Sequence, residues 1–484
     1  MNTLQPTLVW RHFEALCAIP RPSKHEDAIC DHVEMWAKER GLSTAVDVAG
    51  NLLIRKAASA GHEQRPGVIM QAHLDMVCQA LSPSDGGTPH DFMRDPIRTE
   101  QKDGWLLAPN TTLGADNGIG VALALAALED DTLAHGPLEV LLTVDEEAGM
   151  GGAHGLQSGW LQSRLMLNLD TEERGEFYLG CAGGCDVGVQ RSVTREPVPV
   201  GCQVLEIGVG GLRGGHSGCD IHLGRGNANR LLARVLRELD QELDGGLRLS
   251  AMQGGTARNV LPREASAIVA VSKPASAGVE TILGKLQDAL RGEFAGIDDG
   301  LRLSRHAVEG SSVISRYDQD ALLAALVASS YGVRSMSSDF PGVVDSSNNL
   351  GIVVLEGTSF SANLMVRSLR DAGTLALATE IERVWLERQS QVSIEGHYPG
   401  WTPNPQSPLL ALCQRVYRNE FGTDPRIQVI HAGLECGIIG AKYPGLDTVS
   451  FGPTIRSAHA PGERVDIVSV AQTWHLLRSI LMAI

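Results

Sequence analysis

The stretch LLTVDEEAGMGG, residues 141–152, places concentrated negative charge at the end of an apolar run. The run LLTV is typical of a buried strand. Three consecutive carboxylates follow it, and these are Asp145, Glu146 and Glu147. Like charges repel one another, and carboxylates beside a sheet are costly to bury without a partner. The stretch therefore predicts that positive charge gathers at the end of this strand.

Several other segments also end an apolar run in a side chain that can bind a metal. They are GVIMQAHLDMV with His73 and Asp75, NTTLGADNGIG with Asp116, RLMLNLDTEE with Asp170, and VSFGPTIRSAHAPGE with His459. Ligands at strand ends converge on one rim of an α/β sheet. A cluster of carboxylates and imidazoles there suits zinc or a similar divalent ion, and two such ions would offset the repulsion between the acidic residues.

Each motif alone has an ordinary explanation. A lone His-x-Asp is usually a strand end, a Glu-Glu pair is usually solvated surface, and Asp-Asn-Gly is most often a turn. His459 could be a plain loop histidine. The combination in one chain favours the metal site. In His-Leu-Asp, Asp75 shares a strand face with His73 and could accept its ring N–H while the other nitrogen binds metal.

The order of expected elements indicates the α/β class. Strands are predicted at 51–55, 67–72, 138–144 and 164–169, with helices at 117–129 and 150–160. IPRPSKHEDAI predicts an earlier helix that runs through Trp36, with Ser23 as its N-cap and Glu26 as the capping-box partner.

Residues 188–389 are predicted to form a second domain inserted into the first. The first half predicts strand 203–209, helix 227–243, strands 247–252 and 264–272, and helix 278–292. The second half predicts strand 301–306, helix 319–330, strands 350–355 and 361–367, and helix 371–389. This order suggests one β-α-β-β-α unit used twice, although the residue identities do not repeat. Residues 1–187 and 390–484, closed by a helix at 465–483, would form a split catalytic domain.

Composition excludes several classes of protein. The 484 residues carry 41 basic and 57 acidic side chains, a net charge of −16, and no basic stripe suits a nucleic acid. No segment is long and apolar enough to span a bilayer, and the N-terminus is charged too early for a signal peptide. The nine cysteines are scattered and odd in number, which predicts reduced thiols and a cytoplasmic location.

Together these segments resemble the two-zinc aminopeptidase/carboxypeptidase/aminoacylase superfamily. Its signature is a strand with His-x-Asp, a bridging Asp in a glycine-rich turn, Glu-Glu, a further Asp and a distant His, and all stand here in that order. IPRPSKHE, QAHLDMVCQ, TLGADNGIG, GGTARNVLPREA and VIHAGLECG resemble its aminoacyl-histidine dipeptidase branch in particular. The resemblance covers nearly the whole chain.

The resemblance implies a di-zinc exopeptidase-type catalytic domain, with a central mixed sheet flanked by helices, and an inserted α+β lid. It also implies that Asp116 bridges two Zn²⁺. His73 and Asp170 would complete one zinc site, and Glu147 and His459 would complete the other. Asp75 would orient His73, and Glu146 would be the general base. Co²⁺ or Mn²⁺ would fit the same ligands. A cis peptide bond is expected between Asp116 and Asn117. Asp145 stands where threonine is common in the branch, and it is expected to be solvated or hydrogen-bonded rather than a ligand.

The resemblance further assigns five candidate substrate contacts, three of them on the lid. His216 in GGLRGGHSG would donate to the oxyanion, and Asn259 and Arg367 would bind the substrate. His431 and Glu435 are candidates for the amino end or the side-chain pocket, and a Glu435→Gln change would then impair dipeptide cleavage most. Without the resemblance, the glycine-rich segment would be a turn and Arg367 a surface arginine.

The implied function is metal-dependent hydrolysis of dipeptides, preferentially Xaa-His, by a zinc-activated hydroxide. A di-zinc aminoacylase, deacetylase or tripeptidase is the alternative, and a non-catalytic scaffold is a remote one. The lid would close to assemble the site. Because a doubled lid could supply every group within one chain, a homodimer is possible but not required.

Overall fold

The computed structural model describes residues 4–484, apart from the side chain of Asp85, and the chain divides into two compact units. Unit 1 contains the residues up to Gly180 together with Trp401–Val429 and Leu434–Ile484. Unit 2 contains Cys181–Gly400 and Ile430–Gly433. Within residues 4–484, no helix is both long and apolar enough to cross a membrane.

Unit 1 is organised around an eight-stranded mixed sheet in the order β1-β2-β6-β3-β7-β23-β8-β22. The strands are β1 (Ser43–Val46), β2 (Leu52–Lys56), β3 (Val68–His73), β6 (Leu138–Thr143), β7 (Leu165–Asn168), β8 (Glu176–Cys181), β22 (Arg426–Ile430) and β23 (Asp447–Ser450). The central strands β6, β3, β7 and β23 are parallel, so their carboxyl ends share one edge. β3 and β6 are buried along their whole length, as expected for strands covered on both faces.

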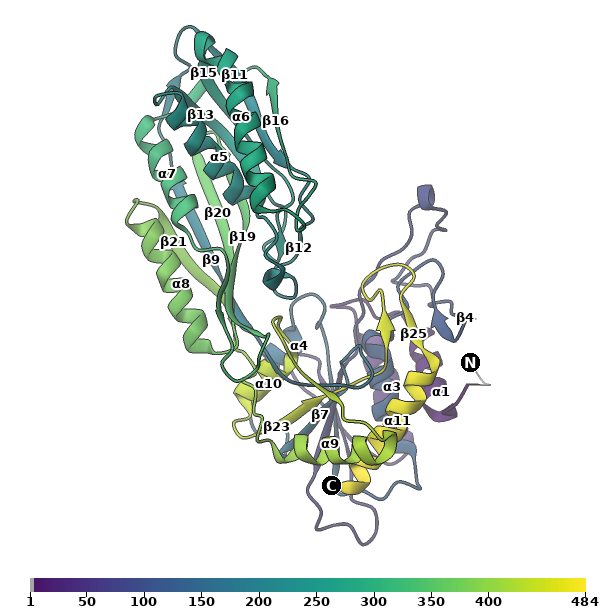
Figure 1. Ribbon diagram of the computed structural model, residues 1–484. Helices are drawn as coiled ribbons and strands as arrows, with labels where there is room; N and C mark the ends of the chain where they lie inside the picture. Colours follow the sequence, from purple (N-terminus) through teal and green to yellow (C-terminus); the bar gives the residue numbers. More distant parts are fainter. Residues whose placement is uncertain (1–3) are drawn as a thin grey trace. The chain divides into compact units, whose positions relative to one another are not determined.

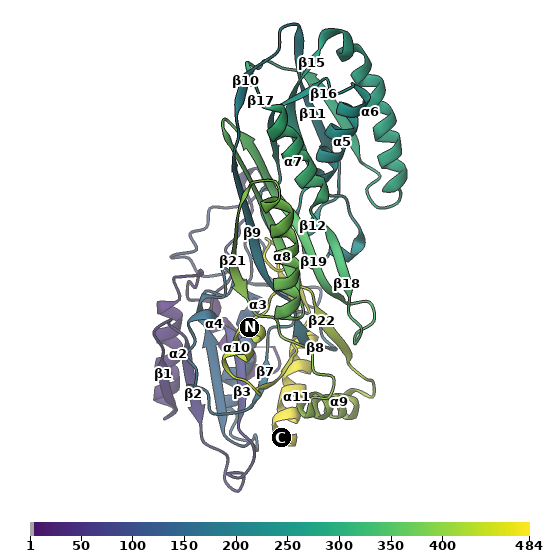
Figure 2. The same cartoon turned by 90° about the vertical axis from the view of Figure 1, so that its left-hand side faces the viewer.

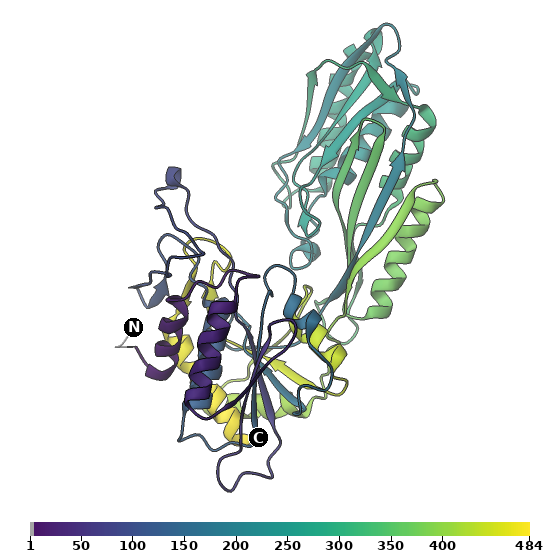
Figure 3. The ribbon, with the colours of Figure 1, turned by 180° about the vertical axis from the view of Figure 1, so that it is seen from behind.

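Helices cover both faces of this sheet (Figures 1 and 3). They are α1 (Thr7–Cys17), α2 (Asp27–Glu39), α3 (Ala115–Glu129), α4 (Gly151–Gly155), α9 (Pro408–Phe421), α10 (Glu435–Lys442) and α11 (Ile467–Ala483). In Figure 1, α1, α3 and α11 lie on one face, while α4 and α10 lie on the other. Helix α3 is apolar all round and buried along nearly its whole length, as a helix packed between a sheet and other helices must be.

A small four-stranded sheet, β24-β25-β5-β4, lies beside these helices in unit 1. Its strands are β4 (Glu100–Lys102), β5 (Trp105–Leu107), β24 (Ile455–Arg456) and β25 (Arg464–Asp466). The loop between β24 and β25 carries His459, whose φ of 65° lies in the left-handed region. The pairing of β24 with β25 therefore anchors both ends of the loop that presents this histidine.

Unit 2 contains a nine-stranded sheet in the order β16-β11-β15-β13-β19-β20-β9-β21, with β18 also paired to β19. The strands are β9 (Gly183–Ser192), β11 (Cys202–Gly210), β13 (Leu247–Gly254), β15 (Ala265–Ser272), β16 (Arg302–Ala307), β18 (Gly332–Met336), β19 (Val344–Glu356), β20 (Ser359–Ser368) and β21 (Gln391–Tyr398). The helices are α5 (Ala228–Glu242), α6 (Lys273–Glu293), α7 (Arg316–Ala328) and α8 (Asp371–Leu386). The remaining short elements are β10 (Arg195–Pro197), β12 (Gly215–His216), β14 (Val260–Leu261), β17 (Ser312–Ile314) and the 3₁₀ turns η1 (Pro83–Asp85, in unit 1) and η2 (Ile221–Leu223). Figure 2 shows α8 packed along β9 and β21.

The order of elements predicted for the two halves of this unit is present, but the second half begins at a different strand. β16, predicted to open the second half, pairs with β11 and closes the first, giving β11-α5-β13-β15-α6-β16 with spatial order β16-β11-β15-β13. The second half takes β9 as its first strand and continues with α7, β19, β20, α8 and β21. Its spatial order, β19-β20-β9-β21, mirrors the first. In the chain, the first half (β11 to β16) therefore follows β9, the first strand of the second half. The order of elements along the sequence does not show this.

This topology also moves the domain boundaries. An insertion of 188–389 would cut β9 in two and leave out β21. Because both strands are hydrogen-bonded into the sheet of unit 2, the boundaries lie at 180/181 and 400/401 instead.

Two local predictions were wrong. Ser23 does not cap α2, which begins at Asp27, because its hydroxyl donates to Asp75 Oδ2 at 2.7 Å. Glu26 accepts from the backbone N–H groups of Lys24 and Asp145, rather than completing a capping box with Ser23. The helix predicted at 150–160 ends at Gly155, after five residues of which three are glycine, the weakest helix former apart from proline.

Candidate functional site

Two groups of possible metal ligands lie at the carboxyl edge of the unit 1 sheet and share one carboxylate. His73, Asp116 and Asp170 form one group, and Asp116, Glu147 and His459 form the other, each with ligand atoms within 4.8 Å of one another. Asp116 Oδ1 is 3.1 Å from His73 Nε2, and Asp116 Oδ2 is 3.0 Å from His459 Nε2. The two oxygens of one carboxylate thus face two different histidines, which is the arrangement of a bridging ligand.

The backbone around Asp116 is held by a carboxylate that sequence reasoning missed. Glu463 is buried and accepts four backbone N–H groups, at 2.7–3.2 Å, from the four residues Leu113–Asp116. The peptide bond between Asp116 and Asn117 is cis, as expected. Glu463 stands in the segment APGE, four residues after His459, so one segment supplies both a candidate ligand and the support for the turn that carries Asp116.

Arg21 is a second supporting residue that the sequence did not reveal. Its buried guanidinium donates to the carbonyls of Leu74 and Asp75 at 2.8 and 3.0 Å and to that of Gly114 at 2.6 Å. It therefore joins the strand end that carries His73 to the turn that carries Asp116. A Cβ at Gly114 would lie 2.4 Å from the guanidinium, and this residue has φ +68°, so glycine is required there.

Asp75 connects His73 to the Glu-Glu segment. Its Oδ1 lies 3.4 Å from His73 Nδ1, and its carboxylate accepts the backbone N–H groups of Glu146 and Glu147 at 3.0 and 3.1 Å. Although burial acts in the opposite direction, these hydrogen bonds and the nearby imidazole lower the pKa of Asp75 to about 2. The carboxylate of Asp75 is therefore ionised near pH 7, and it contacts both the His73 ring and the backbone of Glu146 and Glu147.

The electrostatics of the cluster are those of crowded, buried carboxylates. Burial, together with the negative charges of Asp170, Glu435 and Glu147, raises the pKa of Glu146 well above its ordinary value. Burial also raises the pKa of Asp170 to about 6. The carboxylates of Asp116 and Glu147, which lie 3.0 and 3.1 Å from Nε2 of the ring, raise the pKa of His459 to about 11. The cluster therefore retains protons that a divalent cation would displace.

Polar side chains lie next to the candidate ligands on the same face of the sheet, two residues further from the strand ends. Gln71 precedes His73 by two residues, and its amide donates to Glu435 Oε2 at 2.7 Å. Thr143 donates to the same oxygen at 2.6 Å, and Asn168 donates to Gln71 Oε1.

Glu435 is 1% exposed, and its Oε1 has no hydrogen-bond partner among residues 4–484. Burial raises the pKa of Glu435 to about 7. Its contacts are therefore those of a residue that ties strands together, and its predicted contact with substrate stays a prediction.

Four of the five predicted substrate contacts lie in unit 2, which brings three of them together. Arg367 is buried at the end of β20, and His216 and His431 are close enough for its positive charge to lower their pKa values. A Cβ at Gly218 would lie 2.0 Å from the carbonyl oxygen of His431 and 3.2 Å from Arg367 Nε. The glycine after His216 and Ser217 thus permits this close packing. Asn259 is exposed, although its carbonyl accepts from Ser217 N at 2.8 Å beside the same loop.

The tautomer of His216 follows from its hydrogen bonds. Its Nδ1 accepts the backbone N–H groups of Gly218 and Cys219 at 3.2 and 3.0 Å. Burial, with the charge of Arg367, lowers the pKa of His216 to about 4, so the ring is neutral near pH 7. A neutral ring that accepts at Nδ1 carries its proton on Nε2. His216 is therefore a hydrogen-bond donor at Nε2, as a group facing an oxyanion must be.

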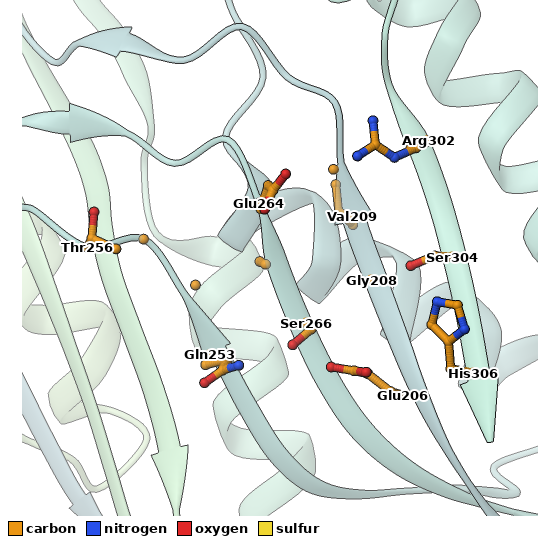
Figure 4. Close-up of a pocket in the computed structure, with 14 residues that line it drawn as sticks. Glu206, Gly208, Val209, Gln253, Thr256, Glu264, Ser266, Arg302, Ser304 and His306 are labelled. Carbon is orange, nitrogen blue, oxygen red and sulfur yellow. The ribbon is translucent and has the colours of Figure 1, made fainter. Parts of the chain in front are cut away.

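A separate hollow of about 540 Å³ lies on the face of the unit 2 sheet away from its helices (Figure 4). Glu206, Glu264, Arg302 and His306 surround a floor of glycine and serine residues. None of the predicted site residues lines it. Among the described residues of the hollow, no buried polar atom lacks a partner, so the hollow shows no sign of a built ligand site.

Comparisons with known proteins find similar sequences and folds. A model of the family described as Peptidase family M20/M25/M40 matches residues 69–483. The chain is 43% identical to the cytosol non-specific dipeptidase of Escherichia coli (strain K12), across 100% of this chain and 99% of that relative. The crystal structure of aminoacylhistidine dipeptidase from Vibrio alginolyticus matches with a TM-score of 0.91 and 42% identity, covering 100% of this chain and 98% of the other. Aminopeptidase PepT from Bacillus cereus matches with a TM-score of 0.56 and 15% identity over 99% of each chain, which shows a shared fold only.

Proposed function

Because this chain belongs to the M20/M25/M40 peptidase family, we propose that it hydrolyses the peptide bond of dipeptides at a two-metal site. The observation that carries the proposal is the pair of ligand groups that share Asp116. Glu146 lies with His73 and Glu147 in a third possible ligand group, which lacks Asp116. We propose that the two groups sharing Asp116 hold the ions and that Glu146 serves in proton transfer.

The residues fit two divalent ions. Glu147 Oε1 is buried and makes no hydrogen bond among the described residues, although His459 Nε2 lies 3.1 Å away. An orphaned carboxylate oxygen facing an imidazole is explained by a cation between them. His73 and Asp170 would hold one ion, Glu147 and His459 the other, and Asp116 both. Zn²⁺ suits this mixture of imidazole and carboxylate, and Co²⁺ or Mn²⁺ would fit as well. When bound, such ions supply a water of lowered pKa and polarise the scissile carbonyl.

The remaining steps belong to side chains of this chain. Glu146 takes a proton from the attacking water and passes it to the leaving amine. His216 donates its Nε2–H to the developing oxyanion. The guanidinium of Arg367 binds the carboxylate of the substrate, for which its planar fork is well matched. Asn259 and His431 are proposed as further substrate contacts.

A dipeptidase is favoured over an aminoacylase or a tripeptidase by the names of two relatives that the chain matches over its whole length. One is named for aminoacyl-histidine substrates and the other as non-specific. We therefore propose that the chain cleaves Xaa-His dipeptides among a wider range. We also propose a cytoplasmic location, because the Escherichia coli relative is named as a cytosolic protein.

A single chain carries all the proposed groups. His216 comes from the first half of unit 2 and Arg367 from β20 in the second, yet both belong to the same compact unit. We propose that a homodimer, if it forms, is not needed to complete the site.

The first test is hydrolysis of Ala-His, Gly-Gly, carnosine and an N-acetyl amino acid by the purified chain. We expect cleavage of dipeptides, with Ala-His among the best, and no cleavage of the acetylated compound. Removal of metal by a chelator should abolish activity, and zinc should restore it, since the cluster alone cannot activate water. Chelator-sensitive cleavage of the acetylated substrate alone would contradict the dipeptidase assignment while leaving the metal site intact.

Glu435 provides a separate prediction. Because its Oε2 accepts from Gln71 and Thr143, an amide oxygen can replace it, and Glu435→Gln should keep kcat/KM for Ala-His within about threefold. Glu435→Ala leaves both donors unpaired and should lower activity about 10–100-fold, a range typical of residues that orient metal ligands. Measuring kcat/KM of both variants on Ala-His distinguishes a structural role of Glu435 from a role in binding the substrate. A large loss with glutamine would instead show that the negative charge of Glu435 binds the substrate's amino group.

A further inference from the structure

Arg367 is a buried cation that forms no ion pair within residues 4–484. Its side chain is about 5% exposed. Asp186, on neighbouring β9, is near enough to feel the charge of Arg367, but its ion pair is with Arg258. The only hydrogen bond from the guanidinium within the described chain runs from Nη1 to the hydroxyl of Tyr398, at 2.7 Å. Its Nε is buried and has no partner among the same residues. A buried guanidinium with a free Nε and no ion pair of its own is suited to bind an anion from outside the chain.

The phenol of Tyr398 reaches Arg367 across a glycine. Gly184 on β9 is the cross-strand partner both of Arg367 on β20 and of Tyr398 on β21. A Cβ at Gly184 would lie 2.8 Å from the Tyr398 hydroxyl and 2.6 Å from the carbonyl oxygen of Val366. Cβ atoms do not approach other heavy atoms so closely. Glycine at position 184 therefore leaves the space through which the ring passes over β9.

A phenol is suited to orienting a guanidinium without neutralising it. Burial raises the pKa of Tyr398 above its ordinary value of 10, so the hydroxyl stays neutral at physiological pH. An aspartate in the same place would form an ion pair and cancel the charge that an incoming carboxylate needs. The neutral hydroxyl fixes Nη1 and leaves the positive charge available.

From this geometry we propose that Tyr398 is a positioning residue, which reaches over Gly184 to hold the Arg367 guanidinium in the orientation that binds the substrate's carboxylate. The proposal rests on the proposed function, in which Arg367 binds that carboxylate. It makes Tyr398 a determinant of selectivity for a free carboxyl terminus, although Tyr398 does not touch the reacting atoms.

Tyr398→Phe removes the hydroxyl oxygen alone and tests the proposal. Calorimetry on the zinc-loaded full chain gives dissociation constants for L-histidine, which has a carboxylate, and for L-histidinamide, which lacks one. We expect the variant to bind L-histidine about tenfold more weakly, the usual effect of losing one charge-assisted hydrogen bond, and L-histidinamide within twofold of the unaltered chain. In turnover, KM for Ala-His should rise about tenfold, with kcat within threefold. Tyr317→Phe, which loses a surface hydrogen bond to Gln389 in the same unit, is the matched control and should change neither constant.

A general structural role would weaken both ligands alike, and that result, or an unchanged affinity for L-histidine, overturns the proposal. Failure of L-histidine to bind the unaltered chain would also overturn it. Binding requires no turnover, so these outcomes are separate from the substrate panel that tests the proposed function. Gly184→Ala offers a second approach, because its methyl group displaces the phenol. It should produce the same selective loss, and equal weakening of both ligands would contradict the proposal.

Discussion

Glu146→Gln should lower kcat for dipeptide hydrolysis about a thousandfold while leaving zinc content unchanged. Glu146 belongs to neither of the two groups that share Asp116, so both ions keep their ligands. The amide cannot accept a proton from water, and general base catalysis contributes about 10²–10⁴ in rate. Steady-state kinetics on Ala-His, with metal analysis of the same preparation, measures both quantities.

The neighbouring carboxylate provides the control for this experiment. Asp145 precedes Glu146 and is half-buried, but it belongs to none of the ligand groups found in residues 4–484. Asp145→Asn removes the same charge from the adjacent position and should keep kcat within about threefold. Turnover by Glu146→Gln at more than a tenth of the original rate would refute the role of Glu146 as base.

Asp116→Asn should abolish activity together with metal binding. The two oxygens of Asp116 face His73 and His459, and an asparagine offers only one neutral oxygen in their place. Both proposed sites therefore lose a charged ligand in one substitution. We expect kcat/KM to fall at least a thousandfold, and metal analysis after gel filtration to show less than one ion per chain.

A variant of an unshared ligand shows whether the two ions share Asp116. His459→Gln affects only the group containing Glu147, so it should remove about one ion per chain and leave the site of His73 and Asp170 occupied. If both variants lost the same amount of metal, or if Asp116→Asn kept two ions, the bridging assignment would be wrong. Thermal unfolding of each variant with and without added zinc checks that the loss is local.

The side chains that gather in the candidate metal site could be predicted from the sequence because each depends on a local pattern. An apolar run followed at once by a histidine or carboxylate puts that side chain at a strand end, and parallel strands bring their carboxyl ends to one edge. His73 follows this rule on β3, and Asp170 lies two residues beyond the end of β7. The central strands and most helices were predicted within a few residues for the same reason, since hydrophobic periodicity is a local property.

Predictions that depended on a choice between partners were less successful. Ser23 and Glu26 have the spacing of a capping box, but their side chains bind Asp75 and the backbone of Asp145, both distant in sequence. β16 follows α6 and precedes α7 in the chain, so sequence order gave no means of assigning it to the first half of unit 2. In both cases tertiary contacts decided between alternatives that were locally equivalent.

The sequence by itself predicted the α/β class and the cluster of acidic and imidazole side chains, because these depend on residue type and position along a strand. Only the tertiary structure identified the residues that hold them. Glu463 binds the turn of Asp116 from nearly 350 positions away, and Arg21 joins that turn to the end of β3. Tyr398 meets Arg367 only because β9 places a glycine between their strands. Such partners are set by the three-dimensional path of the backbone, because a hydrogen bond requires two groups to meet in space and leaves no periodic trace in the sequence.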